Sequence, residues 1–246
     1  MSALIERQPG DRRSIAIETT DAAHLAATRR RLDANQRRWL AETGFDATPG
    51  SFALLADASG KLVRVLAGVD PHDSLAALAA LPCTLPDATY HLASEGVLTD
   101  PAQAALGWAL GAYQFSRYRK PRRAPARLAV AADALKQLAP LVEATCLVRD
   151  LVNTPTEDMG PQQLADAVRR LGKTHRAKLR EWVGDELLAA NFPTIHAVGR
   201  ASHRAPRLVE LSWGKASDPK LVIVGKGVCF DTGGLDLKSS DGMRWM

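Results

Sequence analysis

The hydrophobic positions of this chain fall into two recurring patterns. In some stretches, leucine, valine and alanine return every three or four residues, which is the spacing of an amphipathic helix; in others they form the short apolar runs of buried strands. Residues 1–13 are polar and predict no regular element. The pattern after them predicts a helix over 21–42, strands over 51–56 and 61–68 joined as a hairpin, a helix over 73–81, a strand over 88–93, a helix over 100–117 and a strand over 128–131.

The second half opens on a long amphipathic segment, residues 132–152, which predicts a helix with a kink or a restart at Pro140. After it the pattern predicts a helix over 162–171, a strand over 175–182, a helix over 185–190, a turn or edge segment over 195–199, and strands over 207–213 and 221–224. The last of these is a continuous apolar run that ends at a glycine, which favours a parallel strand buried on both faces. Strands that alternate with helices predict a doubly wound α/β fold.

We therefore expect an α/β protein in three parts. Residues 1–131 form a small N-terminal α/β domain, 132–153 a connecting helix, and 154–246 the start of a doubly wound α/β domain. The stretch 119–127 is basic and contains prolines, as linkers do. Because the second domain has only begun its sheet at Met246, we expect it to be incomplete, with an unpaired sheet edge.

Composition narrows the class of protein. The hydrophobic fraction of 46% and the charged fraction of 24% are those of a soluble globular protein. No apolar run approaches the ~20 residues that span a bilayer, and the N-terminus lacks the apolar core of a secretory signal. The three cysteines are too widely spaced for a disulfide framework or a CxxC metal site. We expect a cytoplasmic location and no membrane partner.

The formal net charge of +5 comes largely from arginine clusters at 29–31, 37–38 and 117–123. A basic surface can attract nucleic acid, but neither zinc-finger spacing nor an aromatic RNA-binding motif accompanies these arginines. They are read as a solvated helix face and a basic linker. We do not expect specific nucleic-acid binding.

The glycine-rich loop after the last predicted strand holds the candidate chemistry, namely Lys226, Asp231 and Lys238. Ligands in open α/β sheets gather beyond the carboxyl ends of the strands. The phosphate-binding pattern GxxxxGK[ST] is not met, because Gly227 follows the lysine, and GxGxxG is not met, because Phe230 stands at the third glycine position. Phosphate binding is therefore not favoured.

A metal site is the second interpretation of this loop. Asp231 is a hard oxygen ligand, and a nearby dication could displace the proton of Lys226 and leave a neutral amine donor. Lys238, kept charged, would suit a position beside a developing oxyanion. An ordinary surface loop with solvated charges is the alternative.

Two segments carry a resemblance to a known family. V-G-K-G-V-C-F-D-T-G-G-L-D-L-K, residues 224–238, resembles the metal-binding core of the leucyl (cytosol) aminopeptidases, and D-L-V-N-T-P-T-E-D-M-G-P-Q-Q-L-A, residues 150–165, resembles the entry to their catalytic domain. The family consists of di-metal exopeptidases. The resemblance implies a metal-dependent aminopeptidase that takes peptide substrates, uses two divalent ions (Mn²⁺ or Zn²⁺), and works as a cytoplasmic homohexamer.

The resemblance also implies a role for each matched residue. Lys226 corresponds to a ligand of one metal, and Asp231 to the aspartate that bridges both. Lys238 corresponds to the catalytic lysine that polarises the scissile carbonyl. Met246 corresponds to a methionine that lines the pocket for the first side chain of the substrate. The alternative is that Met246 is an ordinary methionine packed in the core.

The chain also departs from the family pattern. Asp236, Ser239 and Cys229 stand where the family commonly has a small or neutral polar residue, a proline and a threonine, respectively.

The family's other carboxylate ligands follow the position of Met246, on an aspartate and an N-T-D-A-E-G-R segment that these residues do not include. A two-metal site needs carboxylates from several directions. We therefore expect negligible peptidase activity and weak metal binding from these 246 residues alone. The alternative function is a non-catalytic module, in which the first domain binds a ligand, the basic stretch contacts nucleic acid, or the chain only mediates subunit contacts.

Overall fold

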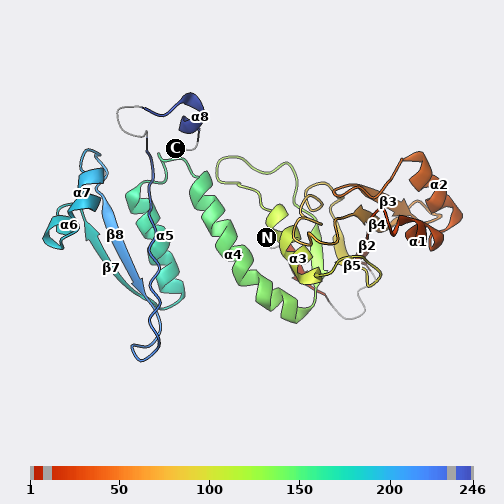
Figure 1. Cartoon of the computed structure of the whole chain (residues 1–246), viewed down its shortest axis with the longest axis horizontal. Coiled ribbons are helices and arrows are strands. Elements are labelled where there is room, and N and C mark those ends of the chain that lie inside the picture. The colour runs from red at the N-terminus through yellow and green to blue at the C-terminus, as the bar shows by residue number, and fades with distance from the viewer. Residues whose placement is uncertain (1–2, 8–12, 232–236, 245–246) are drawn as a thin grey trace. The chain divides into compact units, whose positions relative to one another are not determined.

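The chain divides into two units, Met1–Arg149 and Asp150–Met246 (Figure 1). The structure, a computed structural model, describes residues 3–7, 13–231 and 237–244. Both units combine helices with strands, and the sheet of the first is predominantly parallel, so the predicted α/β class is confirmed. None of the helices in these described ranges combines the length and the apolar character that crossing a membrane requires.

The first unit contains a six-stranded sheet with the order β1-β6-β5-β2-β4-β3. All neighbouring strands are parallel except β3 and β4, which form the predicted hairpin. Asp57 accepts hydrogen bonds from the main chain of Ser59 and Lys61 in its turn, and Gly60 adopts a φ of +82°. The strands are β1 (Leu4–Glu6), β2 (Ile15–Thr20), β3 (Phe52–Ala56), β4 (Leu62–Gly68), β5 (Thr89–Leu92) and β6 (Arg127–Val130).

Helix α3 (Pro101–Gly111) contributes the largest buried side chain of this unit, Trp108. Its ring lies 5.9 Å from that of Tyr90 on β5, and its Nε1 donates a hydrogen bond of 3.3 Å to the oxygen of Ala126. A Cβ at Gly107 would lie 1.8 Å from the main-chain oxygen of Leu75, so this glycine is what lets α3 approach so closely.

Four predictions for the first unit are wrong. Residues 21–42 form two helices, α1 (Leu25–Arg30) and α2 (Ala34–Glu42), because Asp33 caps the second one by accepting a hydrogen bond of 2.8 Å from the main chain of Gln36. Residues 73–81 form turns rather than a helix, and α3 ends at Gly111 instead of residue 117. Strand β1 lies within residues 1–13, for which no regular element was predicted, and strand β2 was not predicted.

Helix α4 (Ala132–Asn153) contains the boundary between the units and continues through Pro140 as one element. In the second unit, β7 and β8 form an antiparallel pair against which α5 packs. The elements of this unit are α5 (Pro161–Thr174), β7 (Lys178–Val183), α6 (Glu186–Ala189), α7 (Pro193–Gly199), β8 (Arg207–Ser212) and α8 (Ser240–Met243). Helix α7 replaces the predicted turn or edge segment at 195–199.

The strand predicted at residues 221–224 is not formed. These four side chains are 65–91% exposed, and the segment has no regular structure. A strand needs a hydrogen-bonded neighbour, and no residue within the described ranges pairs with this segment. The apolar run is therefore present in the sequence without the sheet that would bury it.

Candidate functional site

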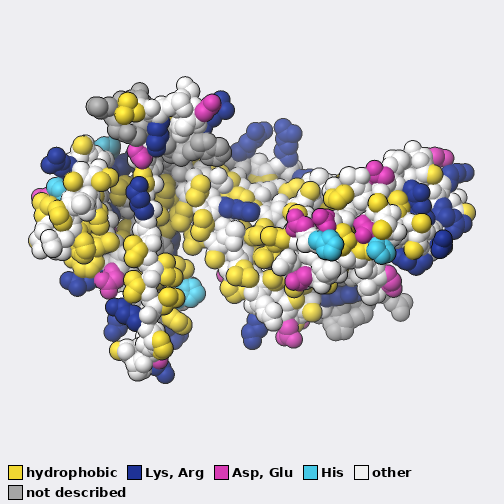
Figure 2. Space-filling view, in the orientation of Figure 1, with side chains coloured by type: hydrophobic (Ala, Val, Ile, Leu, Met, Phe, Trp, Pro, Cys, Tyr) yellow, Lys and Arg dark blue, Asp and Glu magenta, His cyan; other side chains and the backbone are white. Residues whose placement is uncertain are grey.

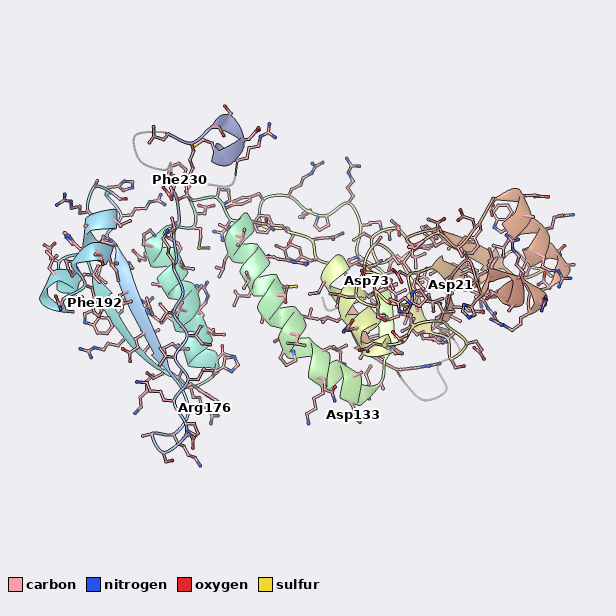
Figure 3. All side chains as sticks on the ribbon, viewed as in Figure 1. Asp21, Asp73, Asp133, Arg176, Phe192 and Phe230 are labelled. Atoms are coloured by element: carbon pink, nitrogen blue, oxygen red, sulfur yellow. The ribbon has the colours of Figure 1, made fainter. Side chains whose placement is uncertain are left out.

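Lys238 and Asp231 lie together in the loop that precedes α8. The Nζ of Lys238 donates a hydrogen bond of 2.8 Å to the main-chain oxygen of Asp231 and lies 3.5 Å from its Oδ2. Both side chains are partly exposed. Ser239 then caps α8, accepting a hydrogen bond of 3.4 Å from the main chain of Gly242. The loop therefore brings a carboxylate and an ammonium group next to each other. Figure 3 labels Phe230, the residue that directly precedes Asp231 in the chain.

Lys226, the third candidate, lies on an exposed part of the same segment. Within the described part of the chain, no hydrogen bond or ion pair joins it to Asp231 or Lys238. The segment passes close to α5 at this point, because a Cβ at Gly227 would lie 2.8 Å from the Cδ2 of Leu164. Glycine permits that approach. Met246, the predicted pocket residue, lies outside the described residues.

The donors in this loop do not by themselves fit a pair of metal ions. Asp231 offers one carboxylate, which faces the ammonium of Lys238, and Lys226 offers one amine. Across the ranges that the structure describes, no three His, Cys, Asp or Glu side chains come together as a metal site. A two-metal centre needs several carboxylates to balance its charge, so these residues alone do not form one.

The segment between α4 and α5 is held by Arg204, which the sequence did not single out. Its Nη1 donates a hydrogen bond of 2.5 Å to the oxygen of Thr156, and its Nη2 donates one of 3.2 Å to the oxygen of Glu157. Gly160 then begins α5, and its main-chain nitrogen donates to Oε1 of Gln163 at 3.1 Å. One guanidinium group thus holds two main-chain carbonyls of residues 150–165, the segment that resembles the entry to the catalytic domain of the family. A single arginine between His203 and Ala205 carries no sequence signal of such a role.

Cys229 is half-buried, two residues before Asp231. Burial raises the pKa of its thiol, and the nearby charge of Arg204 lowers the pKa by a smaller amount. The thiol is therefore protonated at neutral pH, whereas a cysteine nucleophile acts as the thiolate. Cys229 suits a small packing residue better than a nucleophile.

An ion-pair cluster joins α5 to the strands of the second unit. Glu181 on β7 accepts from Nη1 of Arg207 at 2.7 Å and from Nη2 of Arg169 at 2.6 Å. Arg207 belongs to β8 and Arg169 to α5, so three elements meet at one carboxylate. Charge-assisted hydrogen bonds of this kind are the stronger ones in proteins. They fix the helix that carries Leu164, the side chain beside Gly227.

Two family models match the chain. Residues 15–131 match the M17 aminopeptidase N-terminal domain, and residues 146–246 match the catalytic domain of the cytosol aminopeptidase family. Among curated relatives, a probable cytosol aminopeptidase of Leifsonia xyli is 37% identical over 201 residues, covering 77% of this chain and 37% of the relative. One from Rhodococcus opacus is 36% identical over 166 residues, covering 60% and 33%.

Solved structures agree with these matches. The crystal structure of a cytosol aminopeptidase from Coxiella burnetii is 35% identical, with a TM-score of 0.91 over 99% of this chain and 53% of that one. The bottromycin maturation enzyme BotP in complex with Mn is 30% identical, with a TM-score of 0.72 over 94% and 52%. The chain therefore spans about a third of the length of the curated relatives and about half of these solved chains.

Proposed function

The chain belongs to the cytosol aminopeptidase family, and on that premise we propose that it contributes to a metal-dependent aminopeptidase, which releases N-terminal amino acids from peptides. The observation that carries the proposal is the loop in which Lys238 and Asp231 lie together, within the region that matches the family's catalytic domain. Metal-assisted hydrolysis of a peptide bond uses carboxylates to hold the metal and a cation to stabilise the negative charge that develops on the carbonyl oxygen.

We assign roles to the loop residues within this proposal. Lys226 and Asp231 are donors to divalent ions, manganese or zinc, in a site that further carboxylates must complete. The manganese complex of BotP, to which this chain is similar, supports the choice of a divalent metal. Lys238 supplies the positive charge that opposes the negative charge developing on the substrate carbonyl oxygen. Met246 contacts the first side chain of the substrate.

We also propose that these 246 residues alone have negligible peptidase activity and bind metal weakly. The support is the donor set: Asp231 supplies a carboxylate and Lys226 an amine, and among the described residues no three His, Cys, Asp or Glu side chains come together as a metal site. Purified chain, incubated with an amino-acid anilide and manganese or zinc, should release no more product than a blank that contains the metal alone. Turnover above that blank, lost on Lys238→Ala, would contradict this part of the proposal.

The aminopeptidase role itself is tested in a chimera. Residues 1–246 of this chain are joined to the part of the Coxiella burnetii enzyme that lies beyond the matched region. We expect the chimera to release the N-terminal residue of a short peptide when manganese is added, and to leave an N-acetylated peptide uncut. The aminopeptidase role would be contradicted if the chimera folds and binds manganese as the Coxiella enzyme does but releases no amino acid.

Assembly and location follow from the same resemblance. We propose a homohexamer and a cytoplasmic location for the enzyme to which this chain contributes; the relatives' names as cytosol aminopeptidases support the location. Light scattering on the chimera gives the subunit number, and fractionation of the source cells gives the location.

A further inference from the structure

Strand β3 (Phe52–Ala56) lies at one end of the six-stranded sheet, and among the described residues it pairs only with β4. Its sequence, FALLA, contains no charged residue and no proline. Figure 1 draws β3 beside α2, and in Figure 2 yellow hydrophobic side chains reach the surface in that region. Monomeric proteins commonly protect an edge strand with a charge or a proline. Neither protects β3.

Two residues of β3 direct their main-chain groups away from the sheet. The oxygen of Ser51 accepts a hydrogen bond of 2.9 Å from the main chain of Gly68, so Ser51 faces β4. Successive residues of an antiparallel strand alternate between facing the partner strand and facing away from it. The N–H and C=O groups of Phe52 and Leu54 therefore point outward. Within the ranges that the structure describes, no main-chain group of another segment forms a hydrogen bond with them.

The opposite edge of the sheet is built differently. Strand β1 has only three residues, and its last one, Glu6, is exposed and followed by an exposed Arg7. Charged side chains on a short edge strand hinder pairing with a further strand. Of the two edges of this sheet, β3 is therefore the one that can accept another strand.

Exposed aromatic side chains flank β3 on both faces of the sheet. On one face, α2 contacts β3, and Nε2 of Gln36 donates a hydrogen bond of 3.2 Å to the oxygen of Ala56. Trp39 lies three residues after Gln36, on the same side of the helix, and is 51% exposed. Phe52 projects to the other face and is 36% exposed. A strand added at this edge would lie between two aromatic rings.

We propose that β3 pairs with β3 of a second copy of this chain, in an antiparallel dimer centred on Leu54, a property separate from the proposed peptidase activity. A twofold axis at Leu54 places Phe52 opposite Ala56 of the second copy. Each outward N–H group then meets a C=O group, as the self-complementary surface of a twofold dimer requires. Because β3 is already held extended by β4, the second copy loses less entropy on pairing than a flexible peptide would.

The charges on α2 also favour a second copy as the partner. Arg38 and Glu42 are both exposed, and their side chains lie 3.6 Å apart on this helix. Because α2 runs alongside β3, the twofold axis reverses the direction of α2 in the second copy. The Arg38 end of one helix is then turned toward the Glu42 end of the other. Opposite charges brought together in this way favour association.

Sedimentation equilibrium on the full 246-residue chain, from about 1 to 100 µM, measures the dimer. The edge variant is Phe52→Lys, which places a charge beside the added strand. The matched control is Leu75→Lys, because Leu75 is 42% exposed and lies in the turns before β5. We expect a wild-type Kd in the micromolar range, since one strand and one helix make a small interface. Phe52→Lys should raise the Kd at least about tenfold, and Leu75→Lys should keep it within about threefold.

Disulfide cross-linking tests the register of the two strands. Residues of a hydrogen-bonded antiparallel pair have Cα atoms about 5.5 Å apart, which a disulfide can span. The double variant Phe52→Cys with Ala56→Cys should therefore give an oxidised dimer on a non-reducing gel. Either single variant should not, because the same position in the two copies is separated by about 13 Å along the strands. The wild type, with its native cysteines, gives the background.

A wild type that stays monomeric at the highest concentration would overturn the proposal, and so would equal association by the wild type and Phe52→Lys. Cross-linking of a single variant as complete as that of the double variant would contradict the register. Growth beyond dimers would also overturn the proposal, and would indicate open-ended pairing of β3 with β1. If the chain stays monomeric but binds a labelled peptide of residues 51–57, the edge takes an extended peptide instead of a second copy.

Discussion

Arg64 on β4 donates a hydrogen bond of 2.7 Å to Oε2 of Glu18 on the neighbouring strand β2. The carboxylate of Glu18 is only 2% exposed, and its other oxygen accepts from Arg31. A buried carboxylate costs free energy unless it is paired. The two arginines are therefore what allows a buried acidic residue on β2, an interior strand of the sheet.

This arrangement predicts the stability of the first unit. The double substitution Arg31→Ala with Arg64→Ala leaves Glu18 buried without a cation and should lower the free energy of unfolding by about 3 to 5 kcal/mol. Urea unfolding measures the change, and Arg30→Ala, at a neighbouring exposed position, should change it by less than about 0.5 kcal/mol. Adding Glu18→Gln to the double substitution should restore part of the loss. No recovery would show that the carboxylate charge is not its cause.

The close approach of α3 gives a second prediction. In Gly107→Ala the new methyl group would meet the main-chain oxygen of Leu75, which belongs to the backbone and cannot rotate away. Overpacking of this kind costs about 1 to 3 kcal/mol. Because the clash is with a backbone atom at 1.8 Å, the cost should lie in the upper part of that range, above the gain of about 1 kcal/mol in helix propensity. Thermal unfolding should show a lower Tm than for the wild type. Gln103→Ala, at an exposed position of the same helix, is the control, and a Tm for Gly107→Ala at or above the wild-type value would contradict the packing.

The pH dependence of the second unit follows from Glu181. Burial alone raises the pKa of its carboxyl group, but hydrogen bonds from Arg207 and Arg169 outweigh that effect and lower the pKa below its ordinary value. A lowered pKa in the folded state adds stability above the ordinary value near 4.5, and this stability is lost as the pH falls through the lowered value.

Urea midpoints for this unit, measured between pH 7 and pH 3, should therefore fall more steeply below about pH 4.5 in the wild type than in Glu181→Gln. The substituted amide cannot titrate, so it removes this part of the pH dependence. Parallel curves for the two proteins would mean that the ion pairs at Glu181 do not form in solution.

Arg204 gives a prediction about local order. Arg204→Ala removes both hydrogen bonds to the carbonyls of Thr156 and Glu157, so the turn before α5 should open more often. Hydrogen exchange should become faster at the amides of Asp158 and Gly160, which donate to Pro155 and Gln163. Arg200→Ala, an exposed arginine nearby, should leave exchange there unchanged. Unchanged exchange in Arg204→Ala would show that the turn is fixed by other contacts.

Much of the fold was predictable from local patterns. The hairpin of β3 and β4 follows from apolar runs on either side of a turn with Asp57 and Gly60, and α5 follows from a proline at its first position. The break between α1 and α2 was missed because the leucine spacing continues across it. Asp33 was the available signal, since aspartate is a preferred N-cap residue.

Other features depend on contacts that a local pattern does not contain. The segment 221–224 has the composition of a buried strand, but a strand also needs a partner. Strand β2 mixes apolar residues with Glu18 and threonines, and its burial depends on arginines far away in sequence. In the candidate site, the sequence indicated Lys226, Asp231 and Lys238 by their resemblance to a family, whereas the contact between the last two came from the structure.

The most direct test of the central claim compares Lys238→Ala with Lys215→Ala in the chimera with the Coxiella enzyme. Lys215 is an exposed lysine in the same unit, before the loop. If Lys238 opposes the charge that develops on the carbonyl oxygen, Lys238→Ala should lower kcat for a leucyl anilide by about 10²- to 10³-fold with little change in KM. Lys215→Ala should match the unsubstituted chimera. Equal kcat values for both variants would contradict the assignment of this loop as the aminopeptidase site.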